Sequence, residues 1–108
     1  MDKIRERHFD KQTIIHSLKA VIDPELMVNI VDLGLVYDVQ LNNREHTIEI
    51  QMTLTTPGCP LGEVIVQNVE QVLKANFTAY QVEVHLVWDP VWTFKNLTKD
   101  GKKALGRD

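Results

Sequence analysis

Three segments of the chain alternate between hydrophobic and polar residues, as strands with one buried face do. They run over residues 35–41, 48–54 and 82–88, and a period of two places every second side chain on the same face. A short polar stretch over residues 42–46 joins the first two segments, which predicts a hairpin. The polar side of the third segment predicts that one face of the sheet meets water while helices cover the other.

Two longer segments carry hydrophobic residues at every third or fourth position, the spacing of a helix with one buried face. The first begins after a capping Asp10 and is predicted to end at Asp23, because Pro24 disfavours helical geometry in the residue before it. The second runs over residues 61–77.

The end of the chain predicts a last short helix that is capped by Asn96 or Thr98 and stops near Gly106. The order helix, strand, strand, helix, strand, short helix predicts an α/β (α+β) fold of two layers. A long helix that links the second and third strands as a right-handed crossover makes them parallel, so the small three-stranded sheet is mixed. The 108 residues fit one domain, with residues 1–9 as a loose leader and residues 23–32 as an ordered loop.

Composition and charge narrow the classes of function. Hydrophobic residues make up 44% of the chain and charged residues 25%, as in folded soluble proteins. No apolar stretch approaches the roughly 20 residues that span a bilayer, and a net charge of −3 argues against a nucleic-acid partner. A single cysteine without an export signal indicates a reducing, cytoplasmic compartment.

The one cysteine, Cys59, lies between two prolines where a strand is predicted to give way to a helix. If the helix begins there, the thiolate occupies the N-cap position, accepts free N–H groups of the first turn and is favoured by the helix dipole. Thiols that are ionised and partly exposed bind metals or attack electrophiles. The alternative is an ordinary buried cysteine, since free cysteine is among the most buried residue types.

A single cysteine also limits the metal chemistry open to the chain. An iron–sulfur cluster needs about four protein ligands, mostly thiolates. A cluster here would therefore be shared across a dimer, completed by other ligand types, or held together with a partner or a small thiol. Such a cluster is exposed and labile, which suits transfer better than electron storage. A closed zinc site is disfavoured, because no Cys-x2-Cys or His-x3-His spacing is present.

Two further features allow either a structural or a functional interpretation. Asp23-Pro24-Glu25 places two carboxylates around a rigid bend, where they can bind a metal or simply form the turn, and the turn is the more common use. Residues 88–92 place two tryptophans in a second turn, either in the core or on a partner-binding surface. A phosphate-binding Gly-rich loop and a Gly-x-Ser-x-Gly elbow are both absent.

Four motifs together resemble the SufT and PaaD-like family of iron–sulfur cluster assembly factors. They are Asp-Pro-Glu-Leu at residues 23–26, Asn-Ile-Val-Asp-Leu-Gly-Leu-Val-Tyr at 29–37, Thr-Leu-Thr-Thr-Pro-Gly-Cys-Pro at 53–60 and Trp-Asp-Pro-Val-Trp at 88–92. The likeness covers nearly the whole chain, in family order. It implies a small cytosolic maturation factor with the iron–sulfur cluster assembly domain.

The resemblance also assigns roles position by position. The cysteine of the family's Thr-x-Pro-x-Cys-Pro motif is Cys59, with Thr55 and Pro57 beside it, and the acidic residue of the Asp-Pro-Glu motif is Asp23. The chain departs from the family at Val91, where many relatives have a second proline. It also lacks the C-terminal cysteines of some PaaD proteins, which favours a plain SufT-like factor.

Residues and resemblance together predict a non-catalytic factor that works with the cluster assembly machinery and helps deliver clusters to apo iron–sulfur proteins. Cys59 is the predicted contact to iron or to a client ligand, and Asp23 and Glu25 are predicted to line the same site. Candidates for partner binding are Trp88, Asp89 and Trp92. A labile cluster shared between chains or with a partner, and a homodimer, stay open. The alternatives are a metal-free adaptor that uses the tryptophan turn and an exposed strand edge, and a thiol-dependent enzyme.

Overall fold

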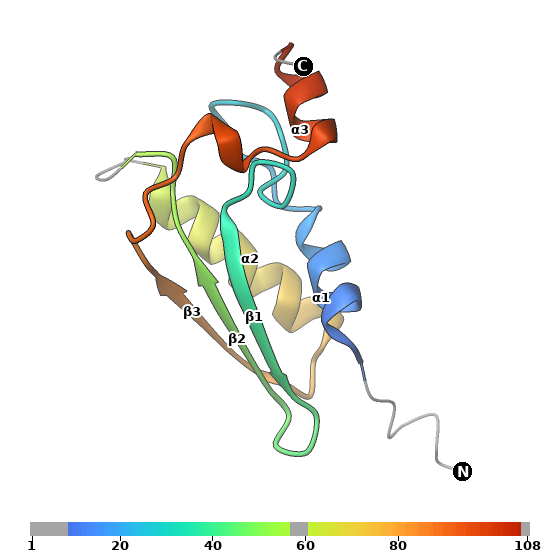
Figure 1. Ribbon diagram of the computed structural model, residues 1–108. Helices are drawn as coiled ribbons and strands as arrows, with labels where there is room; N and C mark the ends of the chain where they lie inside the picture. The colour runs from blue at the N-terminus through green and yellow to red at the C-terminus, as the bar shows by residue number, and fades with distance from the viewer. Residues whose placement is uncertain (1–8, 57–60, 107–108) are drawn as a thin grey trace.

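Helices and strands follow one another in the predicted order. The computed structural model describes residues 9–56 and 61–106 (Figure 1). Its elements are α1 (Lys11–Leu18), β1 (Val36–Asn42), β2 (Thr47–Met52), α2 (Gly62–Asn76), β3 (Gln81–Leu86), the single 3-10 turn η1 (Phe94–Asn96) and α3 (Lys99–Ala104).

The three strands form one mixed sheet in the order β1-β2-β3. β1 and β2 pair antiparallel through the predicted hairpin, and β2 and β3 pair parallel, which confirms the predicted topology. α1 and α2 lie together on one face of the sheet (Figure 1). On the other face, polar residues of β2 and β3 lie side by side, Glu49 beside Glu83 and Gln51 beside His85.

The core lies between the two helices and the sheet. Its largest fully buried side chains come from α1, the loop before β1, the inner face of the central strand β2 and α2, and they include Ile14, Leu18, Ile30, Leu33, Leu35, Ile48, Ile50, Met52, Ile65 and Leu73. Each such side chain contributes about 1.5–3 kcal/mol through removal from water. Burial of the apolar side chains of α2 in this core holds the helix on the sheet.

α1 starts where the sequence predicts and ends earlier. The Asp10 carboxylate accepts hydrogen bonds from the hydroxyl (2.7 Å) and the N–H (2.8 Å) of Thr13, and these bonds lower the pKa of Asp10. The prediction that the helix runs to Asp23 is wrong, because the last helical residue is Leu18. The following residues pair with residues 28–30 instead: the N–H of Ile30 donates to the carbonyl of Val21 at 3.0 Å.

The predicted leader is one residue too long. Phe9 is half-buried, and its backbone exchanges two hydrogen bonds with the Asn43 side chain, at 3.3 and 2.9 Å. Its ring packs edge-on against Phe77, with the ring centroids 4.7 Å apart. The loose-leader prediction is therefore wrong for residue 9, because this aromatic contact ties it to the end of α2. Residues 1–8 lie outside the described residues.

β1 contains a bulge that the alternating pattern does not reveal. Val36 pairs with Met52 while Asp38 pairs with Gln51, so Tyr37 is an extra residue between two consecutive partners. Bulges of this kind re-aim a side chain. The Tyr37 hydroxyl donates to the carbonyl of Pro90 at 2.7 Å, which ties the strand to the turn after β3.

The C-terminal segment is held on the loop before β1 by Asp32. The N–H of Thr98 donates to the Asp32 carbonyl and its hydroxyl donates to the Asp32 carboxylate, both at 2.9 Å. Thr98 also caps α3, since its hydroxyl accepts the N–H of Gly101 at 3.0 Å. The predicted short helix is confirmed, with Thr98 as the cap and Gly106 just past its end.

Within the described residues, none of the helices combines the length and the apolar character needed to cross a membrane.

Candidate functional site

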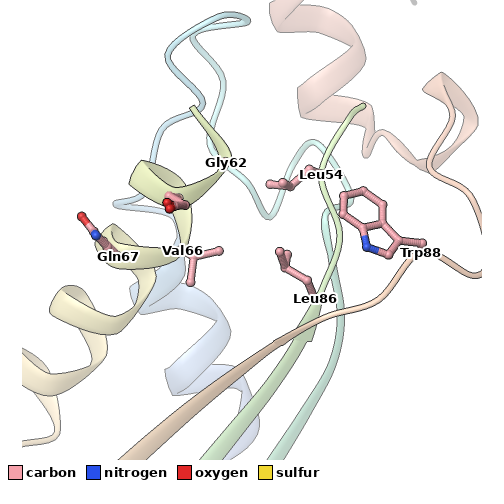
Figure 2. A pocket seen from close by; sticks show the side chains of 7 residues that line it. Leu54, Gly62, Val66, Gln67, Leu86 and Trp88 are labelled. Carbon is pink, nitrogen blue, oxygen red and sulfur yellow. The ribbon is translucent and has the colours of Figure 1, made fainter. Parts of the chain in front are cut away.

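An apolar pocket of about 470 Å³ opens between the start of α2 and the end of β3. Its described lining is Leu54, Gly62, Glu63, Val66, Gln67, Leu86 and Trp88. Figure 2 shows Val66 of α2 and Leu86 of β3 pointing toward one another, with Leu54 and the Trp88 indole on the strand side. The pocket has the size of a small-molecule site, and Glu63 is the one charged residue in its described lining.

The segment that carries Cys59 joins the two walls of this pocket. Leu54 precedes it and Gly62 follows it, and both line the pocket. Gly62 lets the helix start approach the strand, because a Cβ there would lie 2.5 Å from Cδ1 of Leu54. Cys59 and Pro57 themselves lie outside the described residues, and Thr55 is half-buried at the end of the described strand side.

The predicted N-cap role of Cys59 is wrong. α2 begins at Gly62, so Leu61 occupies the N-cap position, and its side chain makes no capping hydrogen bond. The N–H groups in the first turn of any helix have no partner within that helix. The start of α2 therefore presents donors that suit an anionic group arriving from outside the helix.

Asp23 is a buried turn residue. Its side chain is 2% exposed, and one carboxylate oxygen accepts the N–H groups of Glu25 at 2.8 Å and Leu26 at 3.0 Å. Glu25 is exposed on the same turn. Neither residue belongs to the described lining of the pocket. These hydrogen bonds support the interpretation of the Asp-Pro-Glu motif as a turn. The position of Asp23 and Glu25 beside Cys59 stays a prediction.

Replacing Asp23 separates these two interpretations. Asp23→Ala is expected to lower the free energy of unfolding by about 2–3 kcal/mol, because the part-buried N–H groups of Glu25 and Leu26 lose their acceptor. Asp23→Asn keeps an acceptor oxygen and is expected to cost about 1 kcal/mol or less. Urea denaturation of both variants measures this. Equal free energies of unfolding for the two variants would contradict the turn role. A stable Asp23→Asn variant that does not support maturation of an iron–sulfur enzyme would indicate a functional role for the Asp23 carboxylate.

The two tryptophans of the second turn have different surroundings. Trp92 is 8% exposed, and its indole N–H donates to the carbonyl of Leu33 at 2.6 Å. Trp88 is 43% exposed and lines the pocket. Asp89 is exposed between them. Trp92 is therefore part of the core, while Trp88 presents an aromatic surface to the pocket.

One residue of the Thr-rich stretch was not singled out from the sequence. Thr53 is 1% exposed, and its hydroxyl has no hydrogen-bond partner among the described residues. A buried hydroxyl without a partner costs free energy. The sequence signal was weak, because a threonine in a strand is ordinary.

Metal donors gather elsewhere in the part of the chain that the structure describes. Glu49, Glu83 and His85 place one ligand atom each within 4.8 Å of one another on the polar face of the sheet. All three are exposed, and His85 Nε2 lies 3.3 Å from Glu83 Oε1. An exposed group of this kind is ordinary surface chemistry, so it does not replace Cys59 as the candidate metal contact.

The comparisons with known proteins decide the family. A family model described as "Iron-sulfur cluster assembly protein" matches residues 11–86. The chain belongs to this family. The match takes in the Asp-Pro-Glu turn, the Cys59 segment and Leu86 of the pocket, and it stops before the tryptophan turn.

Named relatives of this iron–sulfur cluster assembly family are similar over most of their length. The chain is 46% identical to the Fe-S protein maturation auxiliary factor YitW of Bacillus subtilis, over 89% of this chain and 93% of that protein. It is 44% identical to the Fe-S protein maturation auxiliary factor SufT of Staphylococcus aureus, over 80% and 97%. A crystal structure of a DUF59 domain from Bacillus anthracis superposes with a TM-score of 0.85, at 41% identity over 91% of this chain and 92% of that one. The predicted family and fold are confirmed.

Proposed function

We propose that this protein is an auxiliary factor of iron–sulfur protein maturation that assists cluster assembly or delivery to apoproteins through Cys59. The family and the two relatives named as maturation auxiliary factors support the role. The observation that carries the site is the position of the only cysteine, in the segment that joins the two walls of the apolar pocket. The proposed compartment is the cytoplasm, where thiols stay reduced.

The cluster is cargo in this proposal. One thiolate from each chain supplies too few of the about four ligands that a cluster takes, so a bound cluster is shared with a second chain or with the receiving protein. The donor set fits brief holding, because Cys59 supplies one soft sulfur ligand and the first turn of α2 supplies N–H groups that have no partner within the helix. A cluster held this way is released when an apoprotein offers a fuller set of thiolates.

The partners in the proposal are apo iron–sulfur proteins and the cluster assembly machinery. Four large apolar side chains are exposed between residues 86 and 94, namely Leu86, Trp88, Val91 and Phe94. Exposed aromatic and aliphatic side chains gathered in one segment are typical of protein-binding surfaces. This segment borders the pocket through Leu86 and Trp88, so a bound client would lie next to the pocket.

The experiment that tests the role follows the rate at which an apo iron–sulfur enzyme gains activity when given a cluster source, with and without this chain. The proposal expects faster activation with the chain and no activation by the chain alone. An unchanged rate would contradict the role. A thiol-dependent enzyme is tested separately by alkylating Cys59 across a pH series, because an activated nucleophile reacts at a lower pH than an ordinary thiol.

A metal-free adaptor is the second candidate, favoured by the exposure of Trp88. Trp88→Ala is expected to weaken client binding at least about tenfold, since an exposed tryptophan is a common hot spot, and to leave the free energy of unfolding within about 0.5 kcal/mol. Trp92→Phe is the matched control, because it loses the indole hydrogen bond to Leu33 and is expected to lower stability while keeping client binding.

Binding measured by isothermal titration and stability measured by urea denaturation give the two readouts. Client binding that Trp88→Ala leaves intact would exclude the tryptophan surface. Full maturation activity in a Cys59→Ala variant that still binds clients would favour the adaptor over cluster delivery.

A further inference from the structure

β3 is an edge strand of the sheet. In the strand order β1-β2-β3 it pairs with β2 alone among the described strands, and Figure 1 shows its other side open. An open edge presents a row of unpaired backbone N–H and C=O groups that can accept another strand. Proteins often protect such edges with proline or lysine, and the sequence Gln-Val-Glu-Val-His-Leu of β3 contains neither.

The hydrogen bonds to β2 show which backbone groups face the open side. The N–H of Gln81 donates to the carbonyl of His46, and the N–H of Val87 donates to the carbonyl of Met52, both at 2.8 Å. Backbone groups of successive strand residues point to alternate sides. The N–H and C=O groups of Val82, Val84 and Leu86 therefore point to the open edge.

The side chains of β3 divide in the same alternating way. Glu83 and His85 lie on the polar face of the sheet, with their side chains 62% and 50% exposed and 3.3 Å apart. Val82 and Val84 pack against the core, and Leu86 is 41% exposed. The open edge thus carries one acid, one base and one exposed apolar side chain.

We propose that β3 pairs antiparallel with β3 of a second copy of this chain, about a two-fold axis at Val84. The two sheets then become one continuous sheet. In this register the two Val84 residues face each other, and Val82 faces Leu86 of the second copy. All three residues have their backbone groups on the open side, so these are the hydrogen-bonded pairs of the new ladder.

Charge complementarity selects this register. Glu83 faces His85 of the second copy in a pair without backbone hydrogen bonds, where opposite side chains come closest. The two-fold axis makes this contact twice. Sliding by two residues in one direction places Glu83 opposite Glu83, and in the other places His85 opposite His85. Like charges directly opposite each other destabilise a sheet, which disfavours the first alternative, and the second removes His85 from its position opposite Glu83.

The faces of the two copies also match. Residues opposite each other in an antiparallel pair point to the same face of the sheet. Both α2 helices therefore lie on one face and both polar faces lie on the other, and the exposed Leu86 gains Val82 of the second copy as an apolar neighbour. The pairing uses no residue of the Cys59 segment, and it shares only Leu86 with the proposed client surface.

Sedimentation equilibrium of the whole chain tests the proposal. The wild type is expected to be a dimer, and Val84→Pro is expected to raise the dissociation constant at least about tenfold, because it removes the N–H at the axis. The fold should survive, since the bonds to β2 come from the neighbouring residues. A wild type that stays monomeric at high concentration would overturn the proposal, and the open edge would then be available to a strand of another protein. A folded Val84→Pro variant that dimerises as the wild type does would also overturn it.

Charge variants keep the test decisive if Val84→Pro does not fold. His85→Glu places like charges opposite each other and is expected to weaken the dimer about tenfold. The double variant Glu83→His with His85→Glu restores both pairs in swapped form and is expected to recover the wild-type constant within about threefold. Equal dissociation constants for all three proteins would overturn the pairing.

Crosslinking reads the register directly. In a Cys59→Ser background, chains carrying Glu83→Cys are mixed with chains carrying His85→Cys under a mild oxidant. The proposed register joins the two kinds of chain by a disulfide and leaves each kind alone uncrosslinked. Crosslinking of Glu83→Cys chains with one another would contradict it.

Discussion

Cys59→Ser is expected to abolish the ability of this protein to speed maturation of an apo iron–sulfur enzyme, with a loss of at least about tenfold in the activation rate. Serine has nearly the same size but does not ionise to a soft metal ligand. The free energy of unfolding is expected to stay within about 0.5 kcal/mol of the wild type, because serine fills nearly the same volume as cysteine. Activation kinetics and urea denaturation provide the two readouts.

A control on α2, the helix that follows the Cys59 segment, sharpens this result. Gln71 is exposed on α2 and is not in the described lining of the pocket, so Gln71→Ala is expected to keep full activity. Loss of activity in both variants would point to a general defect of the preparation. Full activity in Cys59→Ser, with Gln71→Ala also active, would remove the thiol from the mechanism.

Gly34→Ala is expected to lower the free energy of unfolding by about 3–5 kcal/mol, a large effect for one methyl group. Gly34 has φ of 76°, in the region that side chains rarely adopt, and an added Cβ would lie 2.2 Å from the carbonyl oxygen of Asn96. Backbone atoms cannot give way cheaply. The 3-10 turn that contains Asn96 would move, and with it the hydrogen bond between Trp92 and Leu33.

Gly106 provides the matched control for that substitution. Its φ is 71°, almost the same as that of Gly34, but among the described residues beyond its chain neighbours no atom lies within 4 Å of an added Cβ. Gly106→Ala therefore carries only the backbone strain, about 1–2 kcal/mol. Equal losses in the two variants by urea denaturation would show that the contact with Asn96 contributes nothing.

Hydrophobic periodicity predicted the order of elements because both layers bury one face. The hydrophobic positions in α2, three or four residues apart, and the alternate hydrophobic positions in β2 are the ones that face the core. The parallel pairing of β2 and β3 followed from the length of the crossover alone.

The errors lie where tertiary contacts override local preference. Val21 fits the apolar stripe of a helix, but its carbonyl accepts a hydrogen bond from Ile30, and α1 ends before it. Tyr37 fits a regular strand, but a bulge re-aims it toward Pro90. Neither partner is local in sequence, so no pattern within a short window could report it.

The candidate site was predictable only in its chemistry. A lone cysteine between prolines identified the segment, but the N-cap assignment failed because the helix starts later, at Gly62. The two tryptophans look alike in sequence, and only the fold assigns Trp92 to the core and Trp88 to the pocket. The unpartnered hydroxyl of Thr53 likewise depends on burial that a sequence does not show.

The most direct measurement of the central claim is the visible absorption spectrum after anaerobic reconstitution with iron and sulfide, recorded together for the wild type and Cys59→Ala. The wild type is expected to show charge-transfer bands that correspond to at most about one cluster per two chains. These bands are expected to disappear when an apo iron–sulfur enzyme is added and becomes active. Cys59→Ala is expected to stay colourless. Identical spectra for the two proteins, or bands that no apoprotein removes, would contradict cluster delivery through Cys59.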